Sequence, residues 1–434
     1  MTGDLTHDDT IFAMASGAGC AAIAVMRLSG PACLDALASL CERRLPAPRH
    51  AALRRLRDAS GTVLDQALVL WLPGPGTYTG EDSAEFFLHG GRAVIDGVAN
   101  ALVSLGLRPA EPGEFTRRAF LHGRLDLVEA EAVHDLVSAE TEAQRRQALR
   151  QLDGELGRIY RRWSDQLRFM LAQQEALIDF PDEDLPPDVE AALAATLFAL
   201  RSEIASHLND GHRGEKLREG LVFAITGAPN VGKSSLINTL AERDVAIVSP
   251  TPGTTRDALE TRVVLGGVPV MLVDTAGLRD TTDAIEAEGV RRALARAAEA
   301  DLVIEVVAGN AASGTPGDRR LLVANKADLG FEPPAGAIRI SALTGEGLDN
   351  LREQLAALAR ALTASDGPPP LTRARHRAAL LEALERLNAA AETTLPELRG
   401  EDLRLAMRAL GRITGHVGVE DILDTLFRQF CIGK

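Results

Sequence analysis

The stretch GAPNVGKSS, Gly227–Ser235, decides the fold of the middle of this chain. It has the spacing Gly-x-x-x-x-Gly-Lys-Ser, follows the apolar run LVFAIT and precedes the helix-forming KSSLINTLA, which is the strand–loop–helix context of a phosphate-binding loop. The glycines let the backbone curl around an anion, and the start of the helix adds a partial positive charge. In such a loop Lys233 reaches the β- and γ-phosphates and Ser234 binds Mg²⁺. The alternative is a chance glycine-rich turn.

Further motifs follow in order and argue strongly against that alternative. Asp274 in DTAG suits the water shell of Mg²⁺, and the Gly277 amide suits the γ-phosphate. The carboxylate of Asp328 in NKAD can accept two hydrogen bonds from guanine, which adenine does not offer. The segment SAL, 341–343, can place a backbone amide at the guanine oxygen. Thr255 in PGTTRD can bind Mg²⁺ only while a γ-phosphate is present, which makes its segment a switch loop. The set predicts binding and hydrolysis of GTP rather than ATP.

The residues of these motifs are the expected contacts of the nucleotide: Asn230, Val231, Gly232, Lys233, Ser234, Ser235, Ser249, Pro250, Thr251, Pro252, Gly253, Thr254, Thr255, Asp274, Thr275, Ala276, Gly277, Asn325, Lys326, Ala327, Asp328, Ser341, Ala342 and Leu343.

Hydrolysis needs a charge that the motifs do not supply. Leu278 stands where small Ras-like GTPases carry a glutamine that orients the attacking water, and no arginine aimed at the γ-phosphate can be identified. Asn230 offers a carbonyl oxygen beside the phosphates. A monovalent cation bound by that oxygen and by carbonyls of the switch loop would supply the missing positive charge. The alternative, that Asn230 only caps the loop, stays open.

The character of the sequence changes outward from this segment. From about Glu219, short Val-, Ile- and Leu-rich runs alternate with helices, which predicts a buried parallel sheet. The residues before it and after the linker TASDGPPPLT have a helical pattern, and the first 122 residues read as a mixed α/β domain. The fold class is therefore a combination of α/β and all-α domains, with the phosphate-binding domain inserted into a helical one. The expected bounds are 1–122, 123–214, 215–365 and 366–434.

One connection in this arrangement is unusually short. Only residues 309–318 separate the apolar runs VIEVVA and LLVANK. A crossover between parallel strands normally takes about a dozen residues or more and includes a helix. Either the crossover helix is reduced to a turn, or the strands end elsewhere.

Composition places the chain among ordinary soluble proteins. Of its 434 residues, 46% are hydrophobic and 25% charged, and no apolar run reaches the roughly 18 residues that span a bilayer. With no secretory signal and scattered cysteines, we expect a cytoplasmic protein that does not insert into membranes. The net charge of −14 and the 4% aromatic content argue against nucleic-acid binding through overall charge or a stacking platform. An RNA ligand would need a local basic patch or a basic partner.

The combination of motifs resembles one GTPase family. GAPNVGKSSLINTL, AIVSPTPGTTRD, DTAGLR and NKAD are similar to GTPases related to Era and EngA. The flanking segments TYTGEDSAEFFLHGG, PGEFTRRAFLHGRLDLVEAEAVHDL, LIDFPDED and the terminal CIGK resemble the MnmE (TrmE) family of tRNA uridine-modification GTPases. The resemblance implies a homodimer, with an N-terminal folate-binding and dimerisation domain and a Ras-like G domain inserted into a helical domain.

The resemblance also implies a reaction. With MnmG, a partner that carries FAD and uses NADH, the family adds an aminomethyl or carboxymethylaminomethyl group to carbon 5 of the wobble uridine of certain tRNAs. The carbon donor is a tetrahydrofolate derivative, such as the 5,10-methylene or 5-formyl form, and FAD belongs to the partner only. Because the partner can also hold tRNA, an acidic chain need not do so alone.

The family's catalytic positions fall on the G domain of this sequence. The resemblance makes Asn230 a ligand of K⁺, together with backbone carbonyls of Ser249, Thr251 and Thr254, and it makes hydrolysis dependent on K⁺ and on G-domain dimerisation. Glu286 matches the residue that positions the attacking water, and with Asn230 and Lys233 it forms the expected catalytic set. Without the resemblance, an exposed glutamate in the first turn of a helix would be the better interpretation.

The family's folate positions fall on Arg27, Glu85, Arg124 and Lys434. Arg124 departs from the pattern, since well-known members carry lysine there; the charge is kept but the shape differs. The alternative for Arg27 and Glu85 is a surface ion pair. Cys431 in FCIGK is given a role near the folate by the resemblance, against the alternative of a small apolar filler.

A function from a different class is an Era- or EngA-type regulatory GTPase in ribosome assembly. Such a switch has no use for a folate pocket, so the N-terminal segment and the terminal CIGK separate the two hypotheses.

Overall fold

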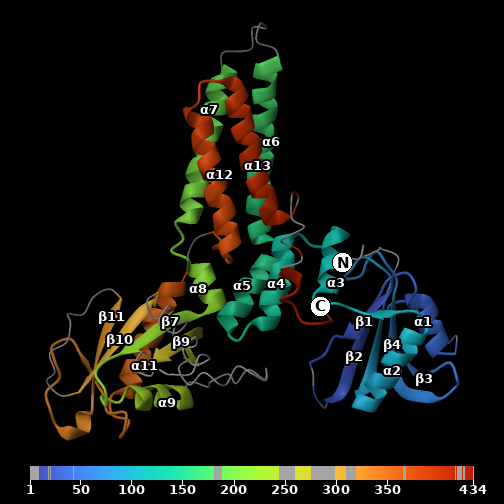
Figure 1. Ribbon diagram of the computed structural model, residues 1–434, viewed down its shortest axis with the longest axis horizontal. Helices are drawn as coiled ribbons and strands as arrows, with labels where there is room; N and C mark the ends of the chain where they lie inside the picture. The colour runs from blue at the N-terminus through green and yellow to red at the C-terminus, as the bar shows by residue number, and fades with distance from the viewer. Residues whose placement is uncertain are drawn as a thin grey trace, which may run out of the picture. The chain divides into compact units, whose positions relative to one another are not determined.

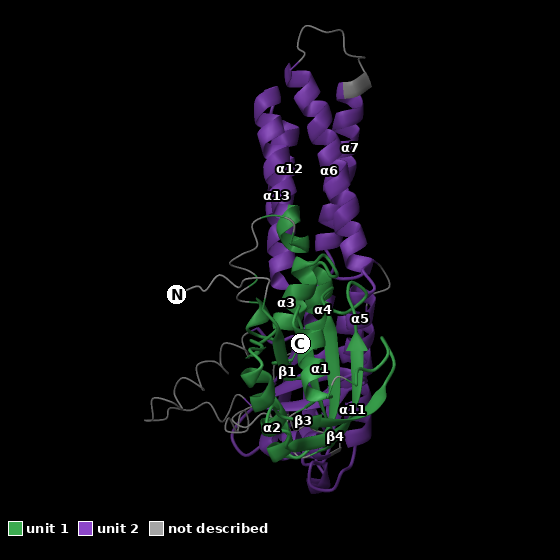
Figure 2. Cartoon of the chain, turned by 90° about the vertical axis from the view of Figure 1, so that its right-hand side faces the viewer, with its two compact units in different colours: residues 1–134, 410–434 green, residues 135–409 purple. Residues whose placement is uncertain are grey.

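The computed structural model describes residues 9–17, 19, 21–42, 44–179, 188–243, 260–274, 299–308, 319–364, 368–415, 417, 423 and 426–433. The chain divides into two compact units, one of residues 1–134 with 410–434 and one of residues 135–409 (Figure 2). None of the helices in the described ranges combines the length and apolar character needed to cross a bilayer.

The first unit is built on a six-stranded sheet in the order β3-β4-β5-β2-β1-β6. Neighbouring strands are antiparallel except β1 and β6, which are parallel. The strands are β1 (Ile11–Met14), β2 (Ala21–Ser29), β3 (Ala52–Arg57), β4 (Val63–Leu72), β5 (Ser83–Gly90) and β6 (Arg108–Pro109). Two helices, α1 (Cys33–Leu40) and α2 (Arg92–Ser104), pack on one face, where Met26, Val69, Trp71 and Phe86 form the centre of the core. The mixed α/β expectation for this segment matches the sheet and its helices.

The second face of this sheet keeps apolar side chains in solvent. Leu53, Leu68, Phe87 and Val25 stand opposite one another on four neighbouring strands. Leu53 is 55% exposed and Leu68 is 46% exposed. Ile23, on the same side of β2, is 59% exposed. An apolar row of this kind is commonly covered by another protein surface.

The C-terminal tail belongs to the first unit. Phe427 and Phe430 pack with Leu127 at the start of α4 (Leu127–Ser138). Gly113, before α3 (Glu114–Leu121), permits this approach, because a β-carbon there would lie 2.7 Å from the carbonyl oxygen of Phe427. Near the end of the chain, a β-carbon on Gly433 would lie 2.0 Å from the carbonyl oxygen of Met14. The tail is therefore fitted closely against the N-terminal sheet.

In the second unit, helices that precede and follow the GTPase motifs in sequence lie side by side (Figure 1). They are α6 (Glu155–Asp179), α7 (Asp188–Leu208), α12 (Ala374–Glu392) and α13 (Pro396–Thr414), the last of which ends in the first unit. Arg201 Nε on α7 donates to Asn388 Oδ1 on α12 at 2.7 Å. Gln174 Nε2 on α6 donates to the Pro396 carbonyl of α13 at 3.1 Å. The shorter α5 (Glu142–Leu152) begins with a capping box formed by Thr141 and Gln144.

A second six-stranded sheet carries the GTPase motifs, in the order β12-β11-β10-β7-β9-β8. Its strands are β7 (Leu221–Thr226), β8 (Glu260–Leu265), β9 (Val268–Asp274), β10 (Leu302–Ala308), β11 (Arg320–Asn325) and β12 (Ile338–Arg339). The helical segments around it are α8 (Arg213–Glu219), α9 (Lys233–Arg243), the short η1 (Ala327–Leu329) and α11 (Leu348–Thr363). All neighbours are parallel except β8 and β9, which are antiparallel.

The sequence pattern predicted the parallel strands but not the antiparallel strand β8. The chain passes from β8 to its partner β9 through the tight turn Gly266–Gly267. The strands on either side of the short connection, β10 and β11, are parallel as expected. The connection itself, 309–318, lies outside the described residues.

Candidate functional site

The phosphate-binding loop joins β7 to α9, as the motif predicted, and its two glycines are fixed by close approaches. Gly227 has a φ of +140°, and a β-carbon there would lie 2.1 Å from the carbonyl oxygen of Val306 on β10. Gly232 has a φ of +97°, and a β-carbon there would lie 2.2 Å from Nδ2 of Asn325. Neither position accepts any other residue without moving a neighbouring strand or loop. The loop can therefore bring its backbone amides close to an anion.

The first residues of α9 carry the polar groups of the site. Lys233 is 5% exposed, and its Nζ donates to the carbonyl oxygens of Gly227 (2.9 Å) and Ala228 (2.8 Å). These bonds fold the ammonium group back over the loop. Ser234 Oγ donates to Asp274 Oδ2 at 3.2 Å, which joins the start of α9 to the end of β9. A hydroxyl and a carboxylate this close are suited to bind Mg²⁺ directly or through its water shell.

Asn325, at the end of β11, links the phosphate loop to the loop that follows β12. It is 2% exposed, its Nδ2 donates to the carbonyl of Val231 at 2.8 Å, and its Oδ1 accepts from the amide of Ala342 at 2.9 Å. Both ends of the amide are therefore used inside the protein. This residue is a positioning residue, because it fixes two loops that contact the nucleotide in the expected arrangement.

The carboxylate expected to read guanine is held from one side. Asp328 Oδ1 accepts a 2.6 Å hydrogen bond from Oγ of Ser341, which is fully buried. Lys326, just before η1, has a φ of +69°, so the chain turns sharply out of β11. Leu343, two residues after Ser341, is 85% exposed. The structure thus brings the predicted NKAD and SAL residues together at one edge of the sheet.

Asn230 occupies the exposed outer part of the phosphate loop. Its φ is +61°, in the left-handed region that asparagine tolerates better than most residues. This conformation agrees with the turn-capping alternative, and it does not conflict with a carbonyl ligand for K⁺.

Several predicted site residues lie outside the described residues. They are Ser249, Pro250, Thr251, Pro252, Gly253, Thr254, Thr255, Thr275, Ala276, Gly277, Glu286 and Lys434. They include the switch-loop ligands of Mg²⁺ and K⁺ and the residue expected to orient water. Within the described ranges, no group of three or more His, Cys, Asp or Glu side chains is arranged to hold a metal ion.

A second polar cluster lies in the first unit, around residues 78–81. Arg27 and Glu85, opposite each other on β2 and β5, form an ion pair with 2.9 Å between Nη2 and Oε1. The Arg27 guanidinium lies 5.9 Å from the ring centre of Tyr78. Arg124 passes beside Gly80, since a β-carbon there would lie 3.4 Å from its Cγ. The structure thus places Arg27, Glu85 and Arg124 around the same loop.

Buried ionic groups that the sequence analysis missed support that loop. Arg118 on α3, 6% exposed, places Nη1 3.1 Å from Oε1 of Glu81. The other oxygen of Glu81 accepts from Oγ of Ser29 at 2.6 Å, and the same Oγ lies 2.6 Å from Oγ1 of Thr79. These contacts hold residues 79–81 against α3 and the end of β2. The i, i+4 spacing of Glu114 and Arg118 could have indicated their ion pair from the sequence. The pairing of Arg118 with Glu81 could not be predicted, because Glu81 is far away in the chain.

The same network extends to the start of β1. Glu114 is 3% exposed and binds Arg108, with 2.6 Å between Oε1 and Nη2. Burial alone would raise the pKa of Glu114, but hydrogen bonds from Arg108 and from the Glu111 amide outweigh it and hold that pKa below its usual value. The pKa of Asp9 is also lowered, because its bonds to Arg108 and Arg118 outweigh the effect of burial. Glu114 and Asp9 are therefore ionised at neutral pH.

The terminal motif lies next to α3. Cys431 is exposed, and its carbonyl oxygen accepts a 3.4 Å hydrogen bond from the amide of Gly113. Its thiol is free, as are those of Cys33 and Cys41, but the latter two are buried in the core of the first sheet.

Comparison with known proteins identifies relatives for the whole chain. Residues 10–124 match the family model described as GTP-binding protein TrmE N-terminus, and residues 127–431 match the MnmE helical domain. A protein of Gluconacetobacter diazotrophicus called tRNA modification GTPase MnmE is 64% identical over 99% of this chain and 100% of its own length. Proteins of the same name from Granulibacter bethesdensis and Rhodospirillum rubrum are 59% and 54% identical, each over 98% of this chain and 99% of their own length.

Proposed function

Because this chain belongs to the MnmE family of tRNA modification GTPases, and is thus a GTP hydrolase that acts in tRNA modification, we propose how its two sites divide that work. The second unit binds and hydrolyses GTP, and the first unit binds a tetrahydrofolate derivative that supplies carbon for the wobble uridine. The N-terminal match argues against the alternative of an Era-type switch with no further reaction. The proposed domains are 1–122, 123–214, 215–365 as an inserted G domain, and 366–434.

The observation that carries the GTP assignment is the pair of loops joined by Asn325. One of its hydrogen bonds holds the phosphate loop at Val231, and the other holds the base loop at Ala342. Asp328, oriented by Ser341, accepts hydrogen bonds from N1–H and the 2-amino group of guanine. Adenine offers no such pair, so it would leave this carboxylate without a partner.

At the phosphate end, Lys233 exchanges its two carbonyl partners for β- and γ-phosphate oxygens when GTP binds. Ser234 and Thr255 hold Mg²⁺, and Asp274 accepts hydrogen bonds from its water shell. Asn230, with carbonyls of Ser249, Thr251 and Thr254, holds K⁺, which supplies positive charge where the phosphoryl group leaves. Glu286 orients the attacking water. The proximity of Ser234 to Asp274 supports the Mg²⁺ part of this proposal.

In the first unit, Arg27, Glu85, Arg124 and Lys434 bind the folate. Supporting observations are the Arg27–Glu85 pair beside Tyr78 and the position of Arg124 against Gly80. A guanidinium fork suits the carboxylates of a folate glutamate tail, and a carboxylate suits its amino-pterin edge. The neighbouring tail residue Gly433 fits against Met14, which supports a contribution from the end of the chain. Cys431 is proposed near this ligand.

The proposed partners are a second copy of this chain, MnmG and tRNA. The apolar row of Leu53, Leu68, Phe87 and Val25 supports a homodimer formed through the N-terminal domain. G domains then pair across their nucleotide faces and activate hydrolysis. An FAD-containing partner, MnmG, and tRNA complete the complex, and FAD remains on the partner.

Two measurements on the purified full-length chain test the proposal. GTP hydrolysis is expected to be much faster in KCl than in NaCl, and ATP is expected not to be hydrolysed. Titration with 5-formyl-tetrahydrofolate is expected to show binding that Arg27→Ala weakens and that Arg55→Ala, on the edge strand β3 of the same sheet, leaves unchanged. Equal hydrolysis rates in the two salts would remove K⁺ from the mechanism. Absence of folate binding at high micromolar ligand would remove the carbon-donor site.

A further inference from the structure

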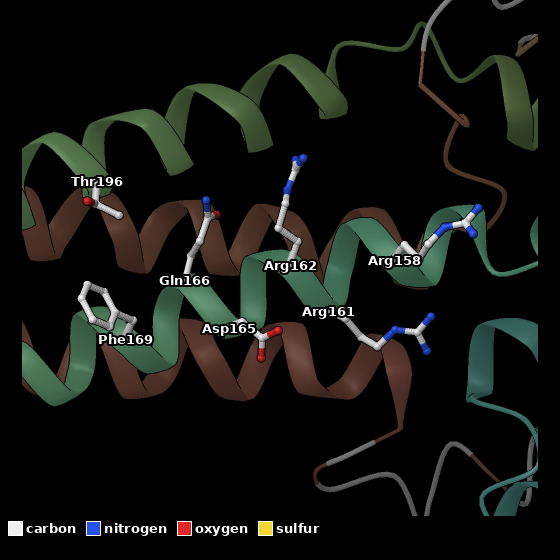
Figure 3. A pocket seen from close by; sticks show the side chains of 7 residues that line it. All are labelled: Arg158, Arg161, Arg162, Asp165, Gln166, Phe169 and Thr196. Atoms are coloured by element: carbon white, nitrogen blue, oxygen red, sulfur yellow. The ribbon is translucent and has the colours of Figure 1, made fainter.

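An open groove of about 600 Å³ runs along one side of α6 (Figure 3). Its basic residues Arg158, Arg161 and Arg162 lie within little more than one turn of the helix. Gln166 and Phe169 continue the same side toward the far end of α6, and Thr196 of α7 closes it. All of these residues belong to the second unit and none of them belongs to the nucleotide site.

The charge of the groove is opposite to that of the chain. The chain has a net charge of −14, whereas the groove contains these arginines and one carboxylate, Asp165, which pairs with Arg168. Arg162 is held by Glu203 at 2.6 Å, and the same oxygen of Glu203 also accepts from the buried Trp163. Arg158 is exposed, and its side chain has no ion pair within the part of the chain that the structure describes. A local positive surface on an acidic protein concentrates an anionic ligand at that place.

Two other groups in the groove limit the chemical class of ligand that would fit it. The Oε1 atom of Gln166 is buried and has no hydrogen-bond partner among the described residues. When the side chain turns toward the groove, this oxygen can accept a hydrogen bond, which a phosphodiester cannot donate but a ribose 2′-hydroxyl can. The ring of Phe169 is 60% exposed at the end of the groove, where it can stack on a base or cover a sugar. Arginine forks for phosphate, an acceptor for a hydroxyl and an aromatic face together fit RNA better than an acidic protein surface.

We propose that this groove on α6 binds the sugar–phosphate backbone of the tRNA substrate. Arg158 and Arg161 donate to phosphate oxygens, Arg162 is oriented by Glu203 to do the same, and Gln166 accepts from a ribose 2′-hydroxyl. The groove thereby supplies the local basic patch that an acidic chain needs in order to hold RNA. This proposal rests on the proposed function for the identity of its ligand, and it adds where that ligand is held.

The test is binding of fluorescently labelled tRNA with a wobble uridine to the full-length protein, across a series of KCl concentrations. The double variant Arg158→Gln/Arg161→Gln is expected to raise the Kd for tRNA about tenfold or more, because each substitution removes a charge-assisted contact with a phosphate. The slope of log Kd against log salt should fall by about 1.5, as two phosphate contacts are lost. Arg158→Gln alone, which removes no ion pair of the described protein, should fall between the double variant and wild type.

The matched control is Arg360→Gln, which removes an exposed arginine of the same unit from α11. It should leave both the Kd and the salt slope at the wild-type values. Gln166→Leu should reduce the preference for RNA over a DNA strand of the same sequence. GTP hydrolysis without tRNA should be unchanged in every variant, because none of these residues contacts the nucleotide site.

Wild-type affinity in the double variant and in Arg158→Gln would overturn the proposal, as would a wild-type protein that does not bind tRNA. Loss of binding to a purified protein partner with unchanged tRNA affinity would also overturn it and assign the groove to that protein. The proposed function is judged separately, by whether the wild-type chain restores wobble-uridine modification in cells that lack it. The proposed tRNA site on α6 can therefore be disproved without disproving the proposed function.

Discussion

The side-chain nitrogen of Asn325 lies 2.2 Å from the position that a β-carbon on Gly232 would occupy. The phosphate loop and the base-binding strand are thus in contact at a point where only glycine fits. Because Asn325 also holds Val231 and Ala342, a displacement there would move both ends of the nucleotide site.

Gly232→Ala is therefore expected to reduce the rate of GTP hydrolysis about 100-fold or more. The alanine side chain would clash with Asn325, and its backbone would be strained at a φ of +97°. Both effects would displace the loop that contacts the transition state. The measurement is the steady-state hydrolysis rate. Gly267→Ala is the control, because that residue also has positive φ, +84°, but meets no atom within 4 Å. A control variant with the same loss of activity would show that backbone strain alone, not the contact with Asn325, is responsible.

Asp328→Asn should change the preferred base from guanine to xanthine. The amide donates where the carboxylate accepted, and the oxygen at position 2 of xanthine accepts where the guanine amino group donated. We expect GTP affinity to fall about 100-fold or more and xanthosine triphosphate to be hydrolysed instead. Competition binding between the two nucleotides measures the change. Retention of full GTP preference by the variant would remove Asp328 from base recognition.

Asn230→Gly separates the two interpretations of Asn230. Glycine adopts the φ of +61° without strain, so the loop conformation is kept while the carbonyl ligand is deleted. If the side chain binds K⁺, the difference in hydrolysis rate between KCl and NaCl should disappear in this variant. If Asn230 only shapes the turn, the variant should keep the wild-type response to K⁺.

The ionic network of the first unit predicts sensitivity to acid. The pKa values of Glu114 and Asp9 are lower in the folded protein than their usual values of 4.5 and 3.8. Their contribution to stability is therefore fully present above about pH 4.5 and is lost as the pH falls through the lower, folded-state pKa values. Thermal unfolding as a function of pH measures this loss.

Glu114→Gln should lower the stability at pH 7 by about 1–3 kcal/mol and flatten its decline in acid, since the charge that Arg108 and Arg118 need is gone. The control Glu111→Gln removes a neighbouring exposed carboxylate. An acid response in Glu114→Gln equal to that of wild type would contradict the role assigned to the network.

The parts of the fold and site that were predictable are those encoded locally. Lys233, Ser234, Asp274 and Asp328 come from motifs in which residue spacing fixes geometry, and the parallel strands come from apolar runs between helices. The antiparallel β8 was not predicted, because GTTRDALETRVVL, residues 253–265, reads as part of the switch loop until its pairing with β9 is known.

Contacts between residues far apart in the chain could not be obtained in this way. The Asn325 bridge and the Arg118–Glu81 pair depend on how distant segments pack, and a single sequence gives no signal for that. The groove on α6 was missed for a related reason. Its arginines share one face of an otherwise ordinary amphipathic helix, and only the packing of α6 and α7 shows that this face borders an open groove.

The most direct test of the central claim is mass analysis of wobble uridines in tRNA from cells that lack this protein. Such cells are then supplied with either the wild-type chain or the Asp328→Asn variant. We expect the modified uridine to disappear in these cells, the wild-type chain to restore it, and the variant, which is unable to use GTP, to leave it absent. Unchanged wobble uridines in the deficient cells, or full restoration by Asp328→Asn, would contradict the claim that GTP hydrolysis at this site serves tRNA modification.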